Sequence, residues 1–225
     1  MPGRASIQLD FLSVLGAWPL LLKGLLVTMA LTAPSSVLGL AMGVACAWVR
    51  REGPAPLRWA VGAYVELIRN SPFIVQLFFV FFGLPSLGLR LSPEAASVLA
   101  MSVNLGAYAT EIVRAGLEAT PPGQIEAALS LGLNRWQIFV RIALAPALQR
   151  VWPAIVSQII LVMLGSAVCG QISTEELSHA ASLIQSRNFR TFEAFIVATL
   201  IYLALAVALR RLLHWAGSRL LFGGA

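Results

Sequence analysis

The side chains that carry most enzyme chemistry are scarce in this chain. Among 225 residues there is one lysine, Lys23, and one aspartate, Asp10. A phosphate-binding loop requires a glycine-rich run that ends in a lysine, whereas Lys23 follows two leucines. The sequence has no GxSxG or HExxH motif, and its two cysteines, Cys46 and Cys169, lie inside apolar runs. We therefore expect no catalytic site, no metal site and no ATP site in the chain itself.

Charged residues inside the apolar stretches are candidates for a pathway or a gate. Glu66 and Arg69 lie three residues apart and can pair on one face of a helix, and Glu111 and Arg114 have the same spacing. Each of these charges would be costly alone in lipid. The pairs could line a translocation path or hold a gate, and they could also simply lock two helices together.

These residues must be positioned by helices that cross a membrane. Hydrophobic residues make up 58% of the chain and charged residues 12%, whereas about a quarter of the residues of a soluble domain are charged. Crossing the hydrocarbon core takes about 20 apolar residues in a helix. The sequence predicts one all-α membrane domain, residues 1–225, with five spans at about 20–49, 59–83, 93–114, 140–172 and 190–212.

The distribution of positive charge predicts the orientation of the bundle. Segments after the first, third and fifth spans carry ten arginines, and the opposite side carries five basic residues. Because cytoplasmic loops are enriched in Lys and Arg, we expect the N-terminus outside and the C-terminus in the cytoplasm. The basic residues are scattered, which argues against nucleic-acid binding. The ten are Arg50, Arg51, Arg58, Arg114, Arg135, Arg141, Arg150, Arg210, Arg211 and Arg219; the five are Arg4, Lys23, Arg90, Arg187 and Arg190.

The longest cytoplasmic segment runs roughly from Arg114 to Arg150, and residues 119–140 within it are predicted to form a helical elbow. A Pro-Pro-Gly cluster breaks the preceding helix, and residues 124–131 form a short pattern rich in Ala and Leu. Gly132 can end that helix because glycine tolerates the left-handed conformation. Asn134 can then cap a second short helix, which has an apolar face at helical spacing.

The elbow carries a recognisable motif. Glu126, Ala127 and Ala128 are followed by Gly132 and, after nine further residues, by Ile142. This pattern resembles the EAA motif of importer permeases of the ATP-binding cassette (ABC) superfamily. The resemblance implies that the segment is a coupling helix on which separate ATPase subunits dock.

The resemblance extends from about residue 20 to residue 220 and is specific to the polar amino acid uptake branch. It implies a type I importer permease with five transmembrane helices, acting as the membrane subunit of an amino acid uptake system in the bacterial inner membrane. The stretches that carry it are 64–72 (YVELIRNSP), 76–79 (QLFF), 107–116, 136–139 and 186–193.

Two departures from the family pattern bear on the mechanism. The proline that closes the motif is Pro146, one place later than in the family, so the kink into the fourth span is expected to shift by one residue. Residues 164–167 read LGSA where the family has Lys-Asp-Thr-Ser. The missing charges leave open whether this chain contacts substrate, and they favour a heterodimer with a second permease over a homodimer.

Polar residues near or within the spans are the candidates for a substrate pathway. Their side chains can hydrogen-bond the carboxylate and ammonium of an amino acid, or they can hold neighbouring helices together. The candidates are Gln76, Asn104, Tyr108, Glu111, Gln158 and Ser166.

The resemblance also implies an assembly. Two ATP-binding subunits would bind ATP and Mg²⁺, a second permease would complete the pathway, and an extracytoplasmic solute-binding protein would deliver the amino acid. The chain itself would bind no cofactor. The alternative is a stand-alone secondary transporter or channel, which usually shows an inverted repeat with broken helices; we find no such repeat in the sequence.

Overall fold

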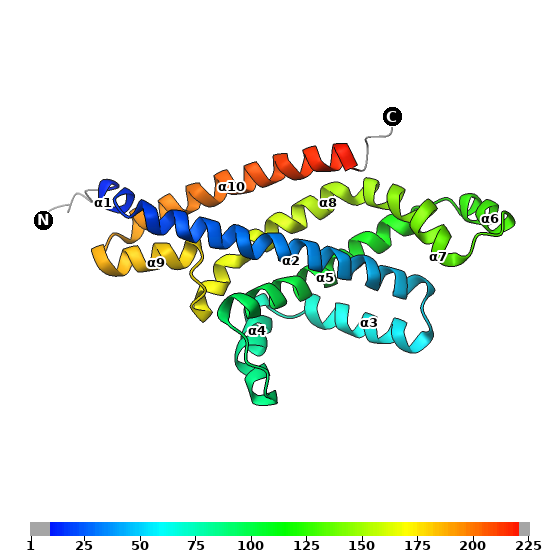
Figure 1. Ribbon diagram of the computed structural model, residues 1–225, viewed down its shortest axis with the longest axis horizontal. Coiled ribbons are helices and arrows are strands. Elements are labelled where there is room, and N and C mark those ends of the chain that lie inside the picture. The colour runs from blue at the N-terminus through cyan, green and yellow to red at the C-terminus, as the bar shows by residue number, and fades with distance from the viewer. Residues whose placement is uncertain (1–9, 221–225) are drawn as a thin grey trace, which may run out of the picture.

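Helices make up most of residues 10–220, the part of the chain that the computed structural model describes, and no strand occurs in that range (Figure 1). Segments with 3₁₀ or π geometry are labelled η. The elements are α1 (Leu12–Leu15), α2 (Trp18–Glu52), α3 (Ala55–Arg69), α4 (Phe73–Phe78), η1 (Phe79–Gly83), η2 (Leu84–Leu87), α5 (Pro93–Glu118), α6 (Pro122–Ser130), α7 (Arg135–Ile138), η3 (Phe139–Ala143), α8 (Leu144–Gly165), η4 (Ser166–Ile172), α9 (Leu177–Asn188) and α10 (Thr191–Leu220).

Four of the helical stretches in the described range are long and apolar enough to cross a membrane. A fifth span results if the bent pair Ala55–Arg69 and Phe73–Leu87 is counted as one. The predicted all-α membrane fold is thereby confirmed. The four stretches are Trp18–Glu52, Pro93–Glu118, Arg135–Ile172 and Thr191–Arg219.

The span predicted for residues 59–83 is bent by 112° between α3 and α4. Pro72 lacks an N–H group, and it disfavours helical backbone at the preceding Ser71. The side-chain amide of Gln76 donates to the carbonyls of Ile68 (2.7 Å) and Ser71 (3.0 Å), so carbonyls freed by the break have a partner. In Figure 1, α4 consequently leaves the bundle as an arm.

The main core lies where α2, α5 and α8 pack together. Leu31, Leu105 and Ile155 represent the three helices in it. A small residue lets α2 approach α5 closely, because a Cβ placed on Gly39 would lie 2.7 Å from the Cβ of Leu105. A second apolar cluster joins α1, α2, α9 and α10 at the other end, and it includes Val14, Leu21, Leu177, Ile184 and Ala198.

The chain leads into α8 through a wider helical turn. Between α7 and α8, η3 has π-helical geometry, which bonds residues five apart rather than four. Pro146 is the third residue of α8, and it cannot donate the usual helical hydrogen bond. The wide turn therefore lies directly before the proline at which the sequence departs from the family pattern.

Candidate functional site

The segment predicted as an elbow folds into two short helices joined by a tight turn. α6 ends at Ser130, Leu131 is its C-cap, and Gly132 follows with a φ of +77°. The N–H of Gly132 donates to the carbonyl of Leu129 (2.9 Å), and the N–H of Leu133 donates to the carbonyl of Ala128 (3.2 Å). These two bonds form the Schellman pattern that satisfies the last carbonyls of a helix. The predicted helix stop at Gly132 is confirmed.

The second helix of the elbow is capped as predicted, and much of the elbow faces outwards. The side chains of Asn134 and Gln137 accept each other's backbone N–H groups at 2.9 Å, which makes a capping box. Of the motif residues, Glu126 and Ala127 are exposed, while Ala128 is buried. Exposed large apolar side chains beside them suit a docking surface. They are Leu129, Leu131 and Trp136.

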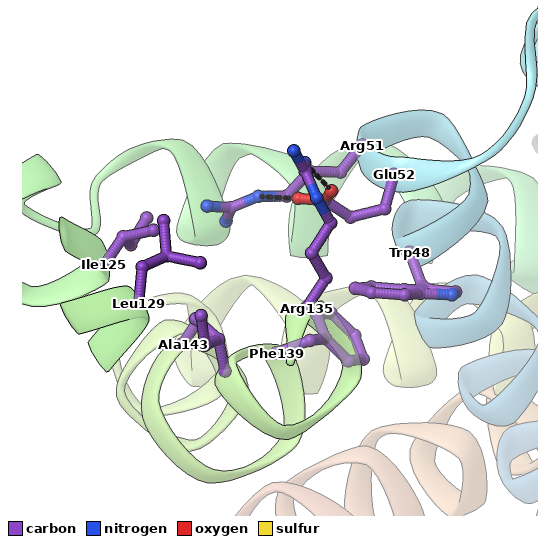
Figure 2. A pocket seen from close by; sticks show the side chains of 9 residues that line it. Trp48, Arg51, Glu52, Ile125, Leu129, Arg135, Phe139 and Ala143 are labelled. Atoms are coloured by element: carbon purple, nitrogen blue, oxygen red, sulfur yellow. Dashed lines mark hydrogen bonds and ion pairs between the residues drawn. The ribbon is translucent and has the colours of Figure 1, made fainter. Parts of the chain in front are cut away.

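The C-terminal end of α2 contacts the elbow. Arg135 Nη1 donates to Glu52 Oε2 at 2.6 Å, and Arg51 Nε lies 3.4 Å from Glu52 Oε1. The ring of Trp48 lies 4.6 Å, centre to centre, from that of Phe139. Figure 2 shows these side chains around a small cavity of ≈ 70 Å³. In the sequence these arginines indicated only the topology, and no local spacing pointed to contacts between residues more than 80 positions apart.

A larger cavity of ≈ 430 Å³ lies between the start of α4, α5 and α8. Three predicted pathway residues line it, namely Asn104 and Tyr108 from α5 and Gln158 from α8. The guanidinium of Arg69 lies 5.5 Å from the centre of the Tyr108 ring, which is a cation–π distance. Among the described residues that line the cavity, none is charged. The structure therefore brings together half of the predicted pathway residues.

Two further predicted pathway residues are buried away from the lining. Gln76 accepts a hydrogen bond from Asn104 Nδ2 at 3.0 Å, and its own amide is bonded to backbone at the α3–α4 bend. Ser166 is fully buried, and its hydroxyl donates to the carbonyl of Met163 at 2.7 Å. Neither side chain lines the cavity in this structure, and a pathway role for the two residues stays a prediction. Gln76 supports the bend and holds Asn104, and Ser166 caps the end of α8.

Glu111, the remaining predicted pathway residue, is part of an ion-pair network. Arg114 Nη2 lies 2.8 Å from Glu111 Oε2, so the predicted pairing of these two is confirmed. Arg50 of α2 donates to Glu111 Oε1 at 3.0 Å. Both carboxylate oxygens are thus bonded within the chain, and Glu111 joins α2 to α5 instead of lining the cavity.

The pairing predicted for Glu66 and Arg69 was wrong. Within residues 10–220, which the structure describes, these two side chains form no ion pair with each other. Glu66 accepts a hydrogen bond from the side chain of Asn70 at 3.0 Å, and Arg69 lies over Tyr108. The physical reason is the bend between α3 and α4, because Arg69 is the last residue of α3. The end of the helix gives Glu66 a neighbouring amide, and packing against α5 gives Arg69 an aromatic ring.

A buried carboxylate near α9 was missed by the sequence analysis. Glu176 is fully buried; it accepts hydrogen bonds from two backbone N–H groups of α9 (2.9 and 2.7 Å) and from the Tyr202 hydroxyl of α10 (2.5 Å). Burial raises the pKa of Glu176. The neighbouring Glu175 is exposed and pairs with Lys23, which lowers the pKa of Glu175. The signal available in the sequence was an acidic residue directly before a helix, a position from which a side chain can accept hydrogen bonds from the first N–H groups of that helix.

Apolar spans beside a cavity that carries a few uncharged polar side chains, with a folded elbow exposed at one end, indicate a helical membrane transport component. The chain belongs to the family described as the inner membrane component of binding-protein-dependent transport systems, whose model matches residues 35–221. The membrane component of this family is non-catalytic and works with ATPase and binding-protein partners.

The relatives and solved structures agree with this family. The chain is 32% identical over 204 residues to the arginine transport system permease protein ArtQ of Bacillus subtilis (90% of this chain, 93% of the relative). It is 33% identical over 204 residues to the L-cystine transport system permease protein TcyB of the same organism (90% and 87%). It superposes on the crystal structure of an amino acid ABC transporter with histidines with a TM-score of 0.84, at 33% identity, covering 95% of this chain and 100% of the other. The predicted type I ABC importer permease fold is confirmed.

Proposed function

We propose that the chain forms half of the translocation pathway of an ABC importer that takes up amino acids. Relatives named as permeases for arginine and for cystine, and an amino acid transporter structure at 33% identity, support the substrate class. The observation that carries the proposal is the elbow. Its exposed α6 ends in a preformed turn at Gly132, so a partner protein meets a folded docking element.

Two ATP-binding subunits dock on this elbow and on that of a second permease, and they bind the ATP and Mg²⁺. Glu126 and Ala127 are exposed on α6, where a small side chain permits close approach to a groove and a carboxylate offers a charged anchor. Closure of the ATP-binding subunits moves the two elbows together. The spans then rock between inward-facing and outward-facing states as rigid bodies.

The amino acid passes along the cavity between α5 and α8. Asn104, Tyr108 and Gln158 offer uncharged donors and acceptors to the carboxylate and ammonium of the substrate. Gly165 lines the same cavity at the position where the family has an acidic residue. Because this chain offers no charge there, we propose a heterodimer in which a related permease supplies it.

The protein lies in the inner membrane with its N-terminus outside and its elbow in the cytoplasm. The support is the ratio of ten arginines to five basic residues across the predicted spans. In Figure 1 the elbow formed by α6 and α7 lies at the opposite end of the bundle from α1 and α9. A solute-binding protein therefore delivers substrate at the α1–α9 end. A stand-alone secondary transporter is not favoured, because the family is that of binding-protein-dependent systems.

Reconstitution into vesicles tests the proposal. The chain is purified in complex with its permease and ATP-binding partners, its binding protein is added, and uptake of a panel of amino acids is measured. We expect uptake that requires both ATP and the binding protein, for the amino acids that raise the thermal stability of that binding protein. Uptake by this chain alone, or uptake that continues without ATP, would contradict the proposal.

A further inference from the structure

We propose that the last turn of α2 is a clamp that transmits movement of the elbow to the α2–α5 pair. The α2 clamp is defined by Trp48, Arg50, Arg51 and Glu52. The inference rests on the proposed function, because it concerns the route by which the elbow moves the spans. Two routes are covalent, since α5 leads into α6 after three residues and α7 continues through η3 into α8. The clamp adds a route through side chains, which joins α2 both to the start of α7 and to the end of α5 that precedes the elbow.

One side of the clamp holds the elbow. The Trp48 ring lies 4.6 Å from the ring of Phe139 and 5.3 Å from that of Trp136, centre to centre, with an edge-on approach to the latter. Glu52 accepts a hydrogen bond from Arg135 at the start of α7 at 2.6 Å. In Figure 2, Glu52 lies between Arg51 and Arg135, and Trp48 lies beside Phe139. The elbow therefore has both aromatic and ionic contacts with α2.

The other side of the clamp holds α5. Arg50 Nη1 donates to Glu111 at 3.0 Å, and Arg51 Nη1 donates to the carbonyl of Leu117 at 3.3 Å. Glu111 is also held by Arg114 of its own helix. One turn of α2 thus grips the elbow and the cytoplasmic end of α5 at the same time.

The position of the cavity gives this connection a consequence for transport. Asn104 and Tyr108 on α5 form one wall of the cavity, and Gln158 on α8 forms another. Asn104 lies about two helical turns before Glu111, the residue that Arg50 holds. The α8 route passes through the π-helical η3, a kind of turn at which helices bend. The clamp therefore ties α2 to the elbow and to the α5 wall, so that α2 moves with them even where the α8 route bends.

The aromatic contact is the stronger part of the clamp. The Arg135 side chain is 77% exposed and that of Glu52 16% exposed, and ion pairs with an exposed partner contribute little. Phe139 is buried against Trp48, and aromatic pairs add to the stability of the contact beyond the area they bury. Trp48 is therefore the position at which a substitution has the largest effect on coupling.

The main test measures the number of substrate molecules imported per ATP hydrolysed by the reconstituted complex. For Trp48→Ala we expect this ratio to fall roughly three- to tenfold, the equivalent of one or two lost aromatic pairs. Trp48→Phe should restore most of the ratio, because it keeps an aromatic ring. The matched control is Trp59→Ala, which removes a tryptophan that is 77% exposed on α3 and should leave the ratio unchanged.

A charge swap tests the ionic part independently of folding defects at Trp48. Glu52→Arg and Arg135→Glu should each lower the ratio about twofold, and the double variant should recover it. The inference is overturned if Trp48→Ala keeps the wild-type ratio, or if it loses its ATP-binding subunits on purification. If Trp48→Ala does not fold, failure of the double variant to recover the ratio overturns it. Absence of ATP-dependent uptake by the wild-type complex would instead contradict the proposed function itself.

Discussion

The two ends of the bundle differ in the polar groups that they bury. At the elbow end, Leu131 is 81% and Trp136 56% exposed, and α6 and α7 extend beyond the spans (Figure 1). At the α9 end, the carboxylate of Glu176 is fully buried and bonded to α9 and to Tyr202 of α10. There the Thr28 hydroxyl of α2 also accepts the first N–H of α9 at 3.3 Å. Both ends expose apolar side chains, since Phe189 directly after α9 is 88% exposed, but the α9 end also holds a buried carboxylate whose hydrogen bonds join α9 to α10.

This difference indicates which end moves. A buried polar network whose members are all bonded makes its surroundings rigid, because any displacement leaves costly unpaired groups. Exposed apolar side chains on a short helix gain by contact with another protein. We infer that the α9 end stays fixed while the elbow end receives force. Four experiments test this comparison.

The largest effect is expected at Gly132. Gly132→Val places a β-branched residue at a φ of +77°, which costs about 1–2 kcal/mol or more and disturbs the turn after α6. Uptake by the reconstituted complex should fall at least about tenfold, while membrane insertion stays intact and ATP hydrolysis continues. The control is Gly132→Asn, since asparagine tolerates this conformation and the space around Gly132 is open. Wild-type uptake by Gly132→Val would count against the elbow as the coupling element.

At the opposite end, Glu176→Ala should affect stability first. The Tyr202 hydroxyl and two N–H groups of α9 would lose their buried acceptor, at a cost of about 1–3 kcal/mol. We expect the thermal unfolding midpoint of the purified protein in detergent to fall by several degrees, roughly 2–4 °C per kcal/mol for a chain of this size. Glu94→Ala, which removes an exposed carboxylate at the start of α5, is the control. An unchanged midpoint for Glu176→Ala would mean that this network does not hold the α9 end together.

The pH dependence of stability tests the same carboxylate without removing its bulk. Because burial raises the pKa of Glu176, the folded protein binds this proton more tightly than the unfolded chain does. The resulting stabilisation is full below the unfolded pKa, about 4.3, and is lost as pH rises through the raised folded pKa. Relative to Glu176→Gln, which cannot ionise, the wild type should therefore gain stability as pH falls. If the stabilities of the two proteins, plotted against pH, changed in parallel, this prediction would be refuted.

The smallest effect is expected for Lys23→Gln. Lys23 and Glu175 pair next to the buried network, but their side chains are 58% and 57% exposed. Solvent screens such pairs, so the unfolding midpoint should not change measurably. A clear fall in the midpoint would show that the α9 end depends on its surface as well as on its interior.

Local features were predictable from the sequence because they depend on neighbouring residues. The apolar spans follow from runs of residues without charge, and the turn after α6 follows from one glycine at one position. The cap at Asn134 needed only Gln137 three residues later. The Glu111–Arg114 pair was predicted from its spacing and formed within one helix.

Features that join distant parts of the chain were decided by the tertiary structure. Glu52 and Arg135 are 83 positions apart, and Glu176 and Tyr202 meet only because α9 packs beside α10. Spacing rules reach about one helical turn, so they could not foresee that Arg69 would lie over Tyr108 or that Gln76 and Ser166 would be buried. The sequence by itself determined a helical membrane protein with an elbow of the importer type. Packing decided which polar side chains line the cavity, which ones hold helices together, and which turn of α2 grips the elbow.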